Sequence, residues 1–237
     1  MRTVFLAGAT GVVGRSLLPL LVNGGWRVFG TTRRPERARD LEGLGAMPVV
    51  VDVLDETALC AAVLAAAPSV VVHQLTDLPH GLDPAQMSAA LVRTAELRDV
   101  GTRNLVKAAL AAGVRRLVAQ SIAFAYADGP LPHGEQDPLA VAAEGTRGLT
   151  ARGVLSLETS VLEADLVGIV LRFGRLYGQR TGMVAPGGSP PLAVSDAARA
   201  SFLAMTCGKT GVYNIAEPDG FASIARARVD IGWSPAG

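Results

Sequence analysis

The sequence predicts an α/β protein built on a doubly wound parallel sheet. Short runs rich in β-branched residues alternate with longer runs rich in Ala and Leu, which is typical of alternating strands and helices. One short run, Val70-Val71-Val72, is apolar throughout, as in a strand that is covered on both faces. A glycine-rich turn follows the first short run. Right-handed crossovers between such strands make a doubly wound sheet the simplest topology.

The elements can be placed in order along the chain. Turn signals mark several boundaries: Asn23-Gly24-Gly25 closes the first helix, Pro35 suits the first turn of the second, and Pro68 stops the third. The predicted strands are Thr3–Ala7, Arg27–Thr31, Val49–Val53, Ser69–His73, Arg116–Ser121, Gly168–Arg172 and Gly211–Asn214. The predicted helices are Val12–Val22, Pro35–Leu44, Glu56–Ala66, Pro84–Ala112, Thr146–Ala164 and Asp196–Met205.

Composition narrows the class of protein. The 22 basic and 21 acidic residues nearly cancel, which argues against nucleic acid as the main partner. No apolar stretch reaches 18 residues without a charge and the N-terminus does not resemble a signal peptide, so we expect no membrane contact and a cytoplasmic location. Cys60 and Cys207 lie far apart, and we expect both to be free thiols.

The strongest motif is the glycine loop Gly8-Ala9-Thr10-Gly11-Val12-Val13-Gly14, between the first predicted strand and helix. Glycines there let the backbone approach a pyrophosphate, and the helix N-terminus offers free N–H groups and partial positive charge. We expect a pyrophosphate to contact this loop, and the alternative is a tight turn without a ligand. The residues predicted to hold it are Gly8, Thr10, Gly11, Val12 and Val13.

The G-x-x-G-x-x-G spacing resembles the extended and atypical short-chain dehydrogenase/reductase superfamily, in its NAD-dependent epimerase/dehydratase-like branch. Further segments resemble that superfamily in the same order along the chain. They are Gly101-Thr102-Arg103-Asn104-Leu105, Arg172-Phe173-Gly174-Arg175-Leu176-Tyr177-Gly178, Val194-Ser195-Asp196-Ala197-Ala198 and Gly211-Val212-Tyr213-Asn214-Ile215. The resemblance implies a Rossmann-type fold and a nicotinamide dinucleotide cofactor. It also implies a homodimer through the fourth and fifth helices, with an ordinary core face as the alternative.

Two parts are expected. Residues 1–173 would form the dinucleotide-binding Rossmann domain, and residues 174–237 a small substrate-binding C-terminal lobe, because the alternation of strands and helices breaks up after Phe173. The lobe is short, which favours a small-molecule substrate over a nucleotide sugar. The resemblance places further cofactor contacts at the ends of later strands. Asp52 and Val53 would face the adenine, Gln74, Leu75 and Thr76 the ribose, and Phe173 and Arg175 the nicotinamide.

The end of the second strand favours NADP over NAD. NAD-binding folds usually have Asp or Glu there for the ribose 2′-hydroxyl, but this chain has Thr32, Arg33 and Arg34. Guanidinium groups suit a 2′-phosphate. The alternatives are NAD as the cofactor and a solvated pair of surface arginines.

The acid/base pair of the superfamily is missing. Its members use Tyr-x-x-x-Lys, in which the two side chains lie one helical turn apart. Only two of the 22 basic residues are lysines, Lys107 and Lys209, and neither follows a tyrosine at that spacing. If Glu158 is the Glu that often follows the Lys, then Val154 takes the Lys position and Thr150 the Tyr position. This departure leaves open whether the chain catalyses a reaction.

Three side chains are candidates for the missing chemistry: Ser121, Tyr126 and Thr150. Ser121 ends the fifth strand and would bond a substrate oxygen or cap a turn. Tyr126 would replace the lost phenol or pack beneath a loop. His133 is a further acid/base candidate, with a solvated loop residue as its alternative.

No metal site is expected, because the histidines and aspartates near residues 73–83 match no ligand spacing. Two functional hypotheses follow. One is an NADP-dependent oxidoreductase, epimerase/dehydratase-like, acting on a small carbonyl or hydroxyl compound. The other is a non-catalytic NADP-binding sensor or scaffold. An epimerase with tightly held NAD is a third option.

Overall fold

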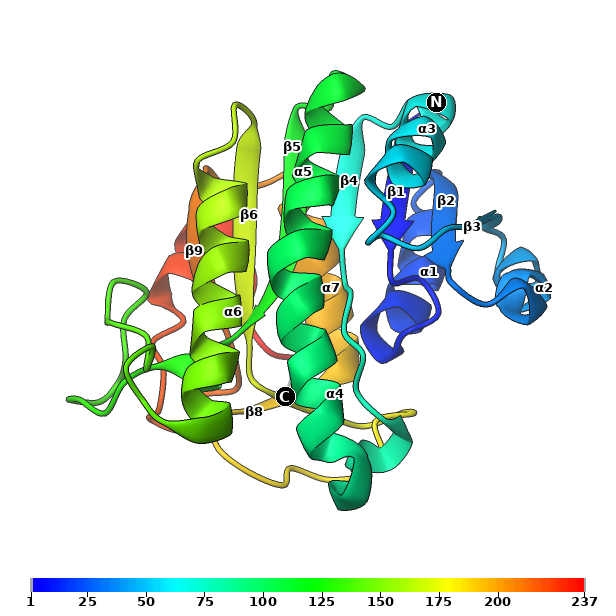
Figure 1. Ribbon diagram of the computed structural model, residues 1–237. Coiled ribbons are helices and arrows are strands. Elements are labelled where there is room, and N and C mark those ends of the chain that lie inside the picture. Colours follow the sequence, from blue (N-terminus) through cyan, green and yellow to red (C-terminus); the bar gives the residue numbers. More distant parts are fainter. Residues whose placement is uncertain (1, 237) are drawn as a thin grey trace.

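A computed structural model describes residues 2–236, with the backbone alone at His80. Seven parallel strands form one sheet in the order β3-β2-β1-β4-β5-β6-β9 (Figure 1). The strands are β1 (Thr3–Ala7), β2 (Arg27–Thr32), β3 (Met47–Val50), β4 (Val70–His73), β5 (Arg116–Ile122), β6 (Val167–Phe173) and β9 (Gly211–Ile215). The order reverses next to β1, which is the doubly wound topology. The predicted fold class is confirmed.

Helices cover both faces of the sheet. One face carries α1 (Val12–Asn23) and α7 (Val194–Ala204), which pack against each other, and the short α2 (Ala38–Glu42) lies by the β3 edge (Figure 1). The other face carries α3 (Glu56–Ala66), α5 (Thr102–Ala111) and α6 (Gly145–Leu162), with α4 (Pro84–Glu96) leading into α5. Two apolar clusters therefore fill the protein, one on each side of the sheet.

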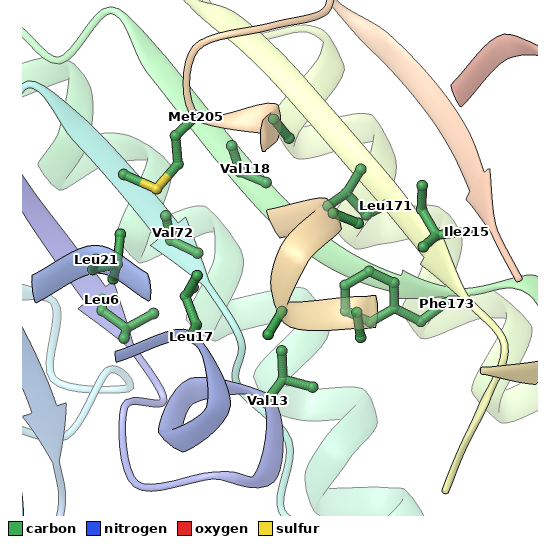
Figure 2. Packing of buried hydrophobic residues seen from close by; sticks show 14 of the residues in the cluster. Leu6, Val13, Leu17, Leu21, Val72, Val118, Leu171, Phe173, Met205 and Ile215 are labelled. Carbon is green, nitrogen blue, oxygen red and sulfur yellow. The ribbon is translucent and has the colours of Figure 1, made fainter. Parts of the chain in front are cut away.

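The cluster on the α1 and α7 side joins early and late parts of the chain. Figure 2 shows Leu17 and Leu21 of α1 packed near Leu6 and Val72 of the sheet, with Met205 after α7 in the same cluster. Leu6, Leu17 and Leu21 are fully buried. Burial of a leucine side chain contributes roughly 1.5–3 kcal/mol, so this cluster fixes the position of α1 beneath the glycine loop.

Two elements differ from the prediction. Strand β3 is Met47–Val50, not Val49–Val53, and it includes Pro48. Proline is tolerated there because β3 is an edge strand, with a pairing partner on one side only. The predicted long helix, Pro84–Ala112, is continuous but contains a π-helical turn at Leu97–Gly101.

Residues after Phe173 contribute to the main sheet as well as to a smaller one. Strands β7 (Arg175–Tyr177) and β8 (Pro191–Ala193) form a two-stranded sheet, whereas β9 pairs with β6. The C-terminal end, for which the sequence predicts no element, contains a π-helical turn at Ala227–Ile231 and the fully buried Trp233. The indole N–H of Trp233 donates to the backbone oxygen of Asp196 at 3.1 Å. The division at residue 173 stays a prediction.

Candidate functional site

The glycine loop packs tightly against the end of β4. Gly8 has a φ of +86°, and a Cβ there would lie 2.5 Å from the backbone oxygen of Gln74. A Cβ at Gly14 would lie 2.3 Å from the oxygen of Gly8, so only glycine lets α1 start this close to the loop. The loop is closed by the Gly11 N–H, which donates to the Gly8 oxygen at 3.0 Å. Because these glycines carry no side chain, a ligand can approach the backbone of the loop.

The start of α1 is suited to an anion. The helix begins at Val12 after Gly11, no side chain caps it, and its first turn has no acidic residue. The N–H groups of that turn lack helical partners and carry partial positive charge. Together with the close-packed glycines, this is a cradle into which a pyrophosphate fits. Thr10 lies in the same loop, and its backbone oxygen accepts a hydrogen bond from the Arg15 side chain.

The end of β2 lies next to the loop and carries the two predicted arginines. The Thr31 hydroxyl accepts from the Gly8 N–H at 3.0 Å, and the Thr32 hydroxyl accepts from the Arg34 N–H at 3.1 Å. Arg33 pairs with Asp77 at 3.1 Å, and Arg93 pairs with the other carboxylate oxygen at 2.6 Å. Partial burial raises the pKa of Asp77, but the hydrogen bond from Arg93 and the charge of Arg33 outweigh it and hold this pKa below its usual value.

The loop after β3 is held by the Gly101–Leu105 segment. Asn104 donates to the backbone oxygen of Val53 at 3.0 Å, and a Cβ at Gly101 would lie 3.2 Å from the Val53 side chain. Asp52 accepts from the Leu54 N–H at 3.0 Å and remains exposed. Asp52 and Val53 thus lie at the same edge of the sheet as the glycine loop, at the carboxyl ends of the strands.

Residues after β4 combine a buried histidine with an unpaired amide oxygen. His73 Nδ1 accepts from the Leu75 N–H at 3.2 Å, so Nε2 carries the proton that is donated to the Thr102 hydroxyl at 2.9 Å. Burial, followed by the positive charge of Arg98, lowers the pKa of His73 to about 4. Gln74 donates to the Ser201 hydroxyl at 3.1 Å, but its Oε1 has no partner within residues 2–236. Thr76 is exposed.

Ser121 belongs to a buried charged network that the sequence did not predict. Its hydroxyl donates to Glu158 at 2.7 Å, and Arg172 donates to both oxygens of Glu158, at 2.9 and 2.7 Å. Each of the two charged side chains is about 5% exposed. Burial opposes the charge of Arg172, but its bonds with Glu158 prevail and raise its pKa above the usual value. Glu158 and Arg172 are both named from the sequence above, but no sequence pattern predicts that they form an ion pair.

Tyr126 extends this network toward the C-terminal lobe. The Arg172 guanidinium lies 4.8 Å from the centre of the Tyr126 ring, and the phenol donates to Asn214 at 2.7 Å. Burial is the main cause that raises the pKa of Tyr126 above its ordinary value, which makes it a weak acid near neutral pH. His133 is stacked on this ring at 4.6 Å and bonds Asp137 at 3.0 Å, so it is buried rather than solvated.

Val154, which the sequence places at the expected Lys position, belongs to a small apolar cluster. Val154 is fully buried on α6 and packs with Ile122, the last residue of β5, and with Ala125 just after it. Phe124 and Leu139 pack against the same cluster. Thr150 lies one turn before Val154, is half-buried and forms no side-chain hydrogen bond within the described part of the chain. We call the set Ile122, Ala125, Val154, Phe124 and Leu139 the apolar wall.

The two residues predicted to face the nicotinamide, one at the end of β6 and one just after it, differ in burial. Phe173 is buried in the core beside α7, as Figure 2 shows, whereas Arg175 is exposed. The Arg175 guanidinium lies 4.2 Å from the centre of the Phe124 ring, next to the apolar wall. Among the described residues, no group of three or more metal-ligating side chains gathers, and no helix is long and apolar enough to cross a membrane.

Comparison with known proteins decides the family. A family model described as NAD(P)H-binding matches residues 8–199. This chain belongs to the NAD(P)H-binding family. The match includes the glycine loop and all strands from β2 to β6. The nicotinamide-dinucleotide-binding family that the resemblance implied is confirmed by this match, and the solved structures of epimerases below share the fold.

The chain is similar to a reductase and to several epimerases. It is 47% identical over 188 residues to a 3-diazoavenalumate denitrifying reductase of Streptomyces sp, covering 78% of this chain and 60% of that protein. The chain therefore spans less than two thirds of that relative. UDP-glucose 4-epimerase of Thermotoga maritima has a TM-score of 0.80 at 18% identity, covering 99% of this chain and 94% of the epimerase. WbmG of Bordetella bronchiseptica, solved with NAD and UDP, has a TM-score of 0.78 at 18% identity, covering 99% and 89%.

Proposed function

We propose that this chain is an NADPH-dependent reductase that removes the diazo group of a small organic carboxylate, in its diazonium form, as N2. The 47% identical relative is named for the reductive denitrification of a diazo carboxylate, and the cofactor class follows from the family. One observation carries the proposal. If Glu158 corresponds to the superfamily's Glu, Thr150 and Val154 replace the proton-donating pair, and Val154 belongs to the apolar wall. Such a site suits a reduction that needs no proton donor.

Reduction of a diazonium group and reduction of a carbonyl differ in whether a proton donor is needed. Reduction of a carbonyl leaves an alkoxide that needs a proton, and loss of the acid that supplies it typically costs 10²–10⁴ in rate. When bound, the reduced nicotinamide supplies a hydride. For a diazonium group the balance closes without a proton, because the C–N bond breaks, N2 leaves with that electron pair, and the hydride pair forms the new C–H bond.

The chain's own groups bind, orient and exclude water. We propose that the glycine loop holds the pyrophosphate, that Asp52 and Val53 face the adenine and that Gln74–Thr76 flank the ribose. The apolar wall keeps water from the reactive nitrogen. Ser121 acts through the Glu158–Arg172 pair as a positioning residue, since its hydroxyl donates to Glu158, and Tyr126 does so through its ring, which lies beside the Arg172 guanidinium.

The reaction can be tested with benzenediazonium-3-carboxylate as the probe. The purified chain with NADPH should yield one benzoate, one N2 and one NADP⁺ per diazonium, faster than NADPH without protein. Cofactor deuterated at the transferring carbon should place deuterium on the ring. A panel of ketones and aldehydes should show no turnover. Carbonyl reduction without diazonium reduction would overturn the proposal, and NADPH binding without any turnover would favour a non-catalytic binding protein.

The preference for NADPH rests on Arg33 and Arg34, which are exposed at the end of β2. The double change Arg33→Ala/Arg34→Ala should weaken NADPH binding by about tenfold or more and leave NADH binding nearly unchanged, because only NADPH carries the 2′-phosphate. Arg39→Ala, an exposed arginine on α2, is the matched control and should change neither affinity. Calorimetric titration measures both. Equal weakening of the two cofactors would refute the preference.

A further inference from the structure

Arg98 is a buried cation without a partner. It lies in the π-helical turn Leu97–Gly101, and its side chain is 6% exposed. Within residues 2–236 its guanidinium forms no hydrogen bond and no ion pair, and Glu158 is the opposite charge that acts on it. Burial of an unpaired guanidinium is costly, so such a group in a folded protein calls for an acceptor.

The charged end of Arg98 is nearly, but not completely, sealed from solvent. Gln74 Oε1 is the one side-chain polar atom of the described residues that is both sealed from solvent and unpaired. Because the guanidinium nitrogens of Arg98 are unpaired but are not sealed, part of the small exposed area belongs to them. The guanidinium is therefore not completely sealed, although bulk water is largely excluded from it.

The neighbours of Arg98 place it at the carboxyl edge of the sheet. Its positive charge lowers the pKa of His73 at the end of β4, and Glu158 on α6 acts on Arg98 in turn. The π-helical turn packs against α6, where Ser156 donates to Asp99. One turn before Glu158 on the same helix stands Val154 of the apolar wall. Arg98 thus lies at the edge of the sheet where β4 ends, between the end of that strand and α6, the helix that carries Val154.

The π-helical turn distinguishes Arg98 from its neighbour. Such a turn contains one residue more than an α-helical turn and changes which side chains face inward, and it occurs often at functional sites. Asp99 is 41% exposed and pairs with Arg103, whereas Arg98, the residue before it, is buried. The local backbone therefore directs a guanidinium inward at a place where a regular amphipathic helix would present apolar side chains.

The charge balance of the buried cluster favours an anion as ligand. This cluster consists of three charged residues that are at least nine-tenths buried: Arg98 and Arg172, which are positive, and Glu158, which is negative. Glu158 is already held by both Arg172 and Ser121. His73 is neutral at ordinary pH, because its pKa is about 4. One positive charge remains, and a single carboxylate would neutralise it.

We propose that Arg98 is the carboxylate-binding residue of the substrate site, which holds the acid group of the substrate while its apolar body lies along the apolar wall. The guanidinium offers donors in a planar fork that fits a carboxylate with two parallel hydrogen bonds. This assignment rests on the proposed function in one respect, the presence of a carboxylate on the substrate.

Paired substrates test the assignment. The ratio of kcat/KM for benzenediazonium-3-carboxylate to that for unsubstituted benzenediazonium should fall about 10- to 100-fold in Arg98→Met, mainly through KM. Arg98→Lys should recover part of the ratio, because it keeps the charge without the fork. Arg103→Met is the matched control, as Arg103 is exposed five residues further along, and should keep the wild-type ratio. An unchanged ratio in Arg98→Met would overturn the proposal.

A binding measurement separates this proposal from the reaction itself. Calorimetry with sodium benzoate should show binding to the wild-type chain, no binding of the neutral benzamide, and loss of benzoate binding in Arg98→Met. If the chain reduces no diazonium but benzoate binding depends on Arg98, the reaction is wrong and the anion site stands. If benzoate binds equally to wild type, Arg98→Met and Arg98→Lys, the anion site is wrong. Should Arg98→Met fail to fold, benzoate binding to Arg98→Lys takes its place: weaker binding than to the wild type supports the anion site, and equal binding overturns it.

Discussion

Mild acid should weaken the fold through His73. The ring is fully buried and its pKa is lowered to about 4 from 6.5, first by burial and then by the charge of Arg98. The unfolded chain therefore binds more protons than the folded chain between these two values. The contribution of His73 to the free energy of unfolding is therefore fully present above about pH 6.5 and is lost as the pH falls toward 4. From the two pKa values, the loss between pH 7.5 and pH 5 is about 2 kcal/mol.

Urea unfolding at a series of pH values measures this loss. The variant His73→Gln keeps an N–H that can donate to the Thr102 hydroxyl and has no proton to gain in this range. Its free energy of unfolding should fall by about 2 kcal/mol less than that of the wild type between pH 7.5 and pH 5. Parallel curves for the two proteins would refute the reasoning. So would an NMR titration in which the His73 ring takes up its proton near pH 6.5.

Three further substitutions test the packing of the site. Glu158→Gln should lower the free energy of unfolding by about 3–5 kcal/mol, measured by urea unfolding, because it leaves Arg172 buried and uncompensated; a loss below 1 kcal/mol would contradict this. Gly14→Ala should abolish NADPH binding in calorimetry, since its Cβ would lie 2.3 Å from the Gly8 oxygen, while Gly134→Ala, where a Cβ meets nothing within 4 Å, should bind normally. Gly153→Leu should lower the melting temperature, because the side chain would push α6 from Ala95 of α4, where even a Cβ comes within 3.2 Å. An unchanged melting temperature would show that α4 and α6 can separate at little cost and would contradict this reasoning.

Local patterns were enough to predict the sheet and the glycine loop. Apolar runs, helix ends and the spacing of Gly8, Gly11 and Gly14 are all written within a few neighbouring residues, and the order of elements follows from them. Strand β3 was misplaced because Pro48 argues against a strand unless the strand is known to lie at an edge. That knowledge comes only from the assembled sheet.

The chemistry beyond the loop depends on contacts between distant segments. Ser121 stood at the predicted end of a strand, but its partner Glu158 is 37 residues later in the chain. No local pattern distinguishes Glu158 and Arg172 from solvated charges, although both are buried. Arg98 is hidden for a further reason: the π-helical turn that directs it inward interrupts the regular period on which the reading of helix faces depends.

The contact between α1 and α7 means that the glycine loop with its helix and the late part of the chain share one cooperative unit. A protein cut at residue 173 would leave Leu17 and Leu21 without the apolar side chains of residues 194–205, so α1, the helix that we propose binds the pyrophosphate, would lose its packing partner. Ligand that binds only the folded form raises the free energy of unfolding of every segment that melts with it. Dinucleotide held at the front of α1 should therefore protect Trp233, more than two hundred residues downstream, from thermal exposure.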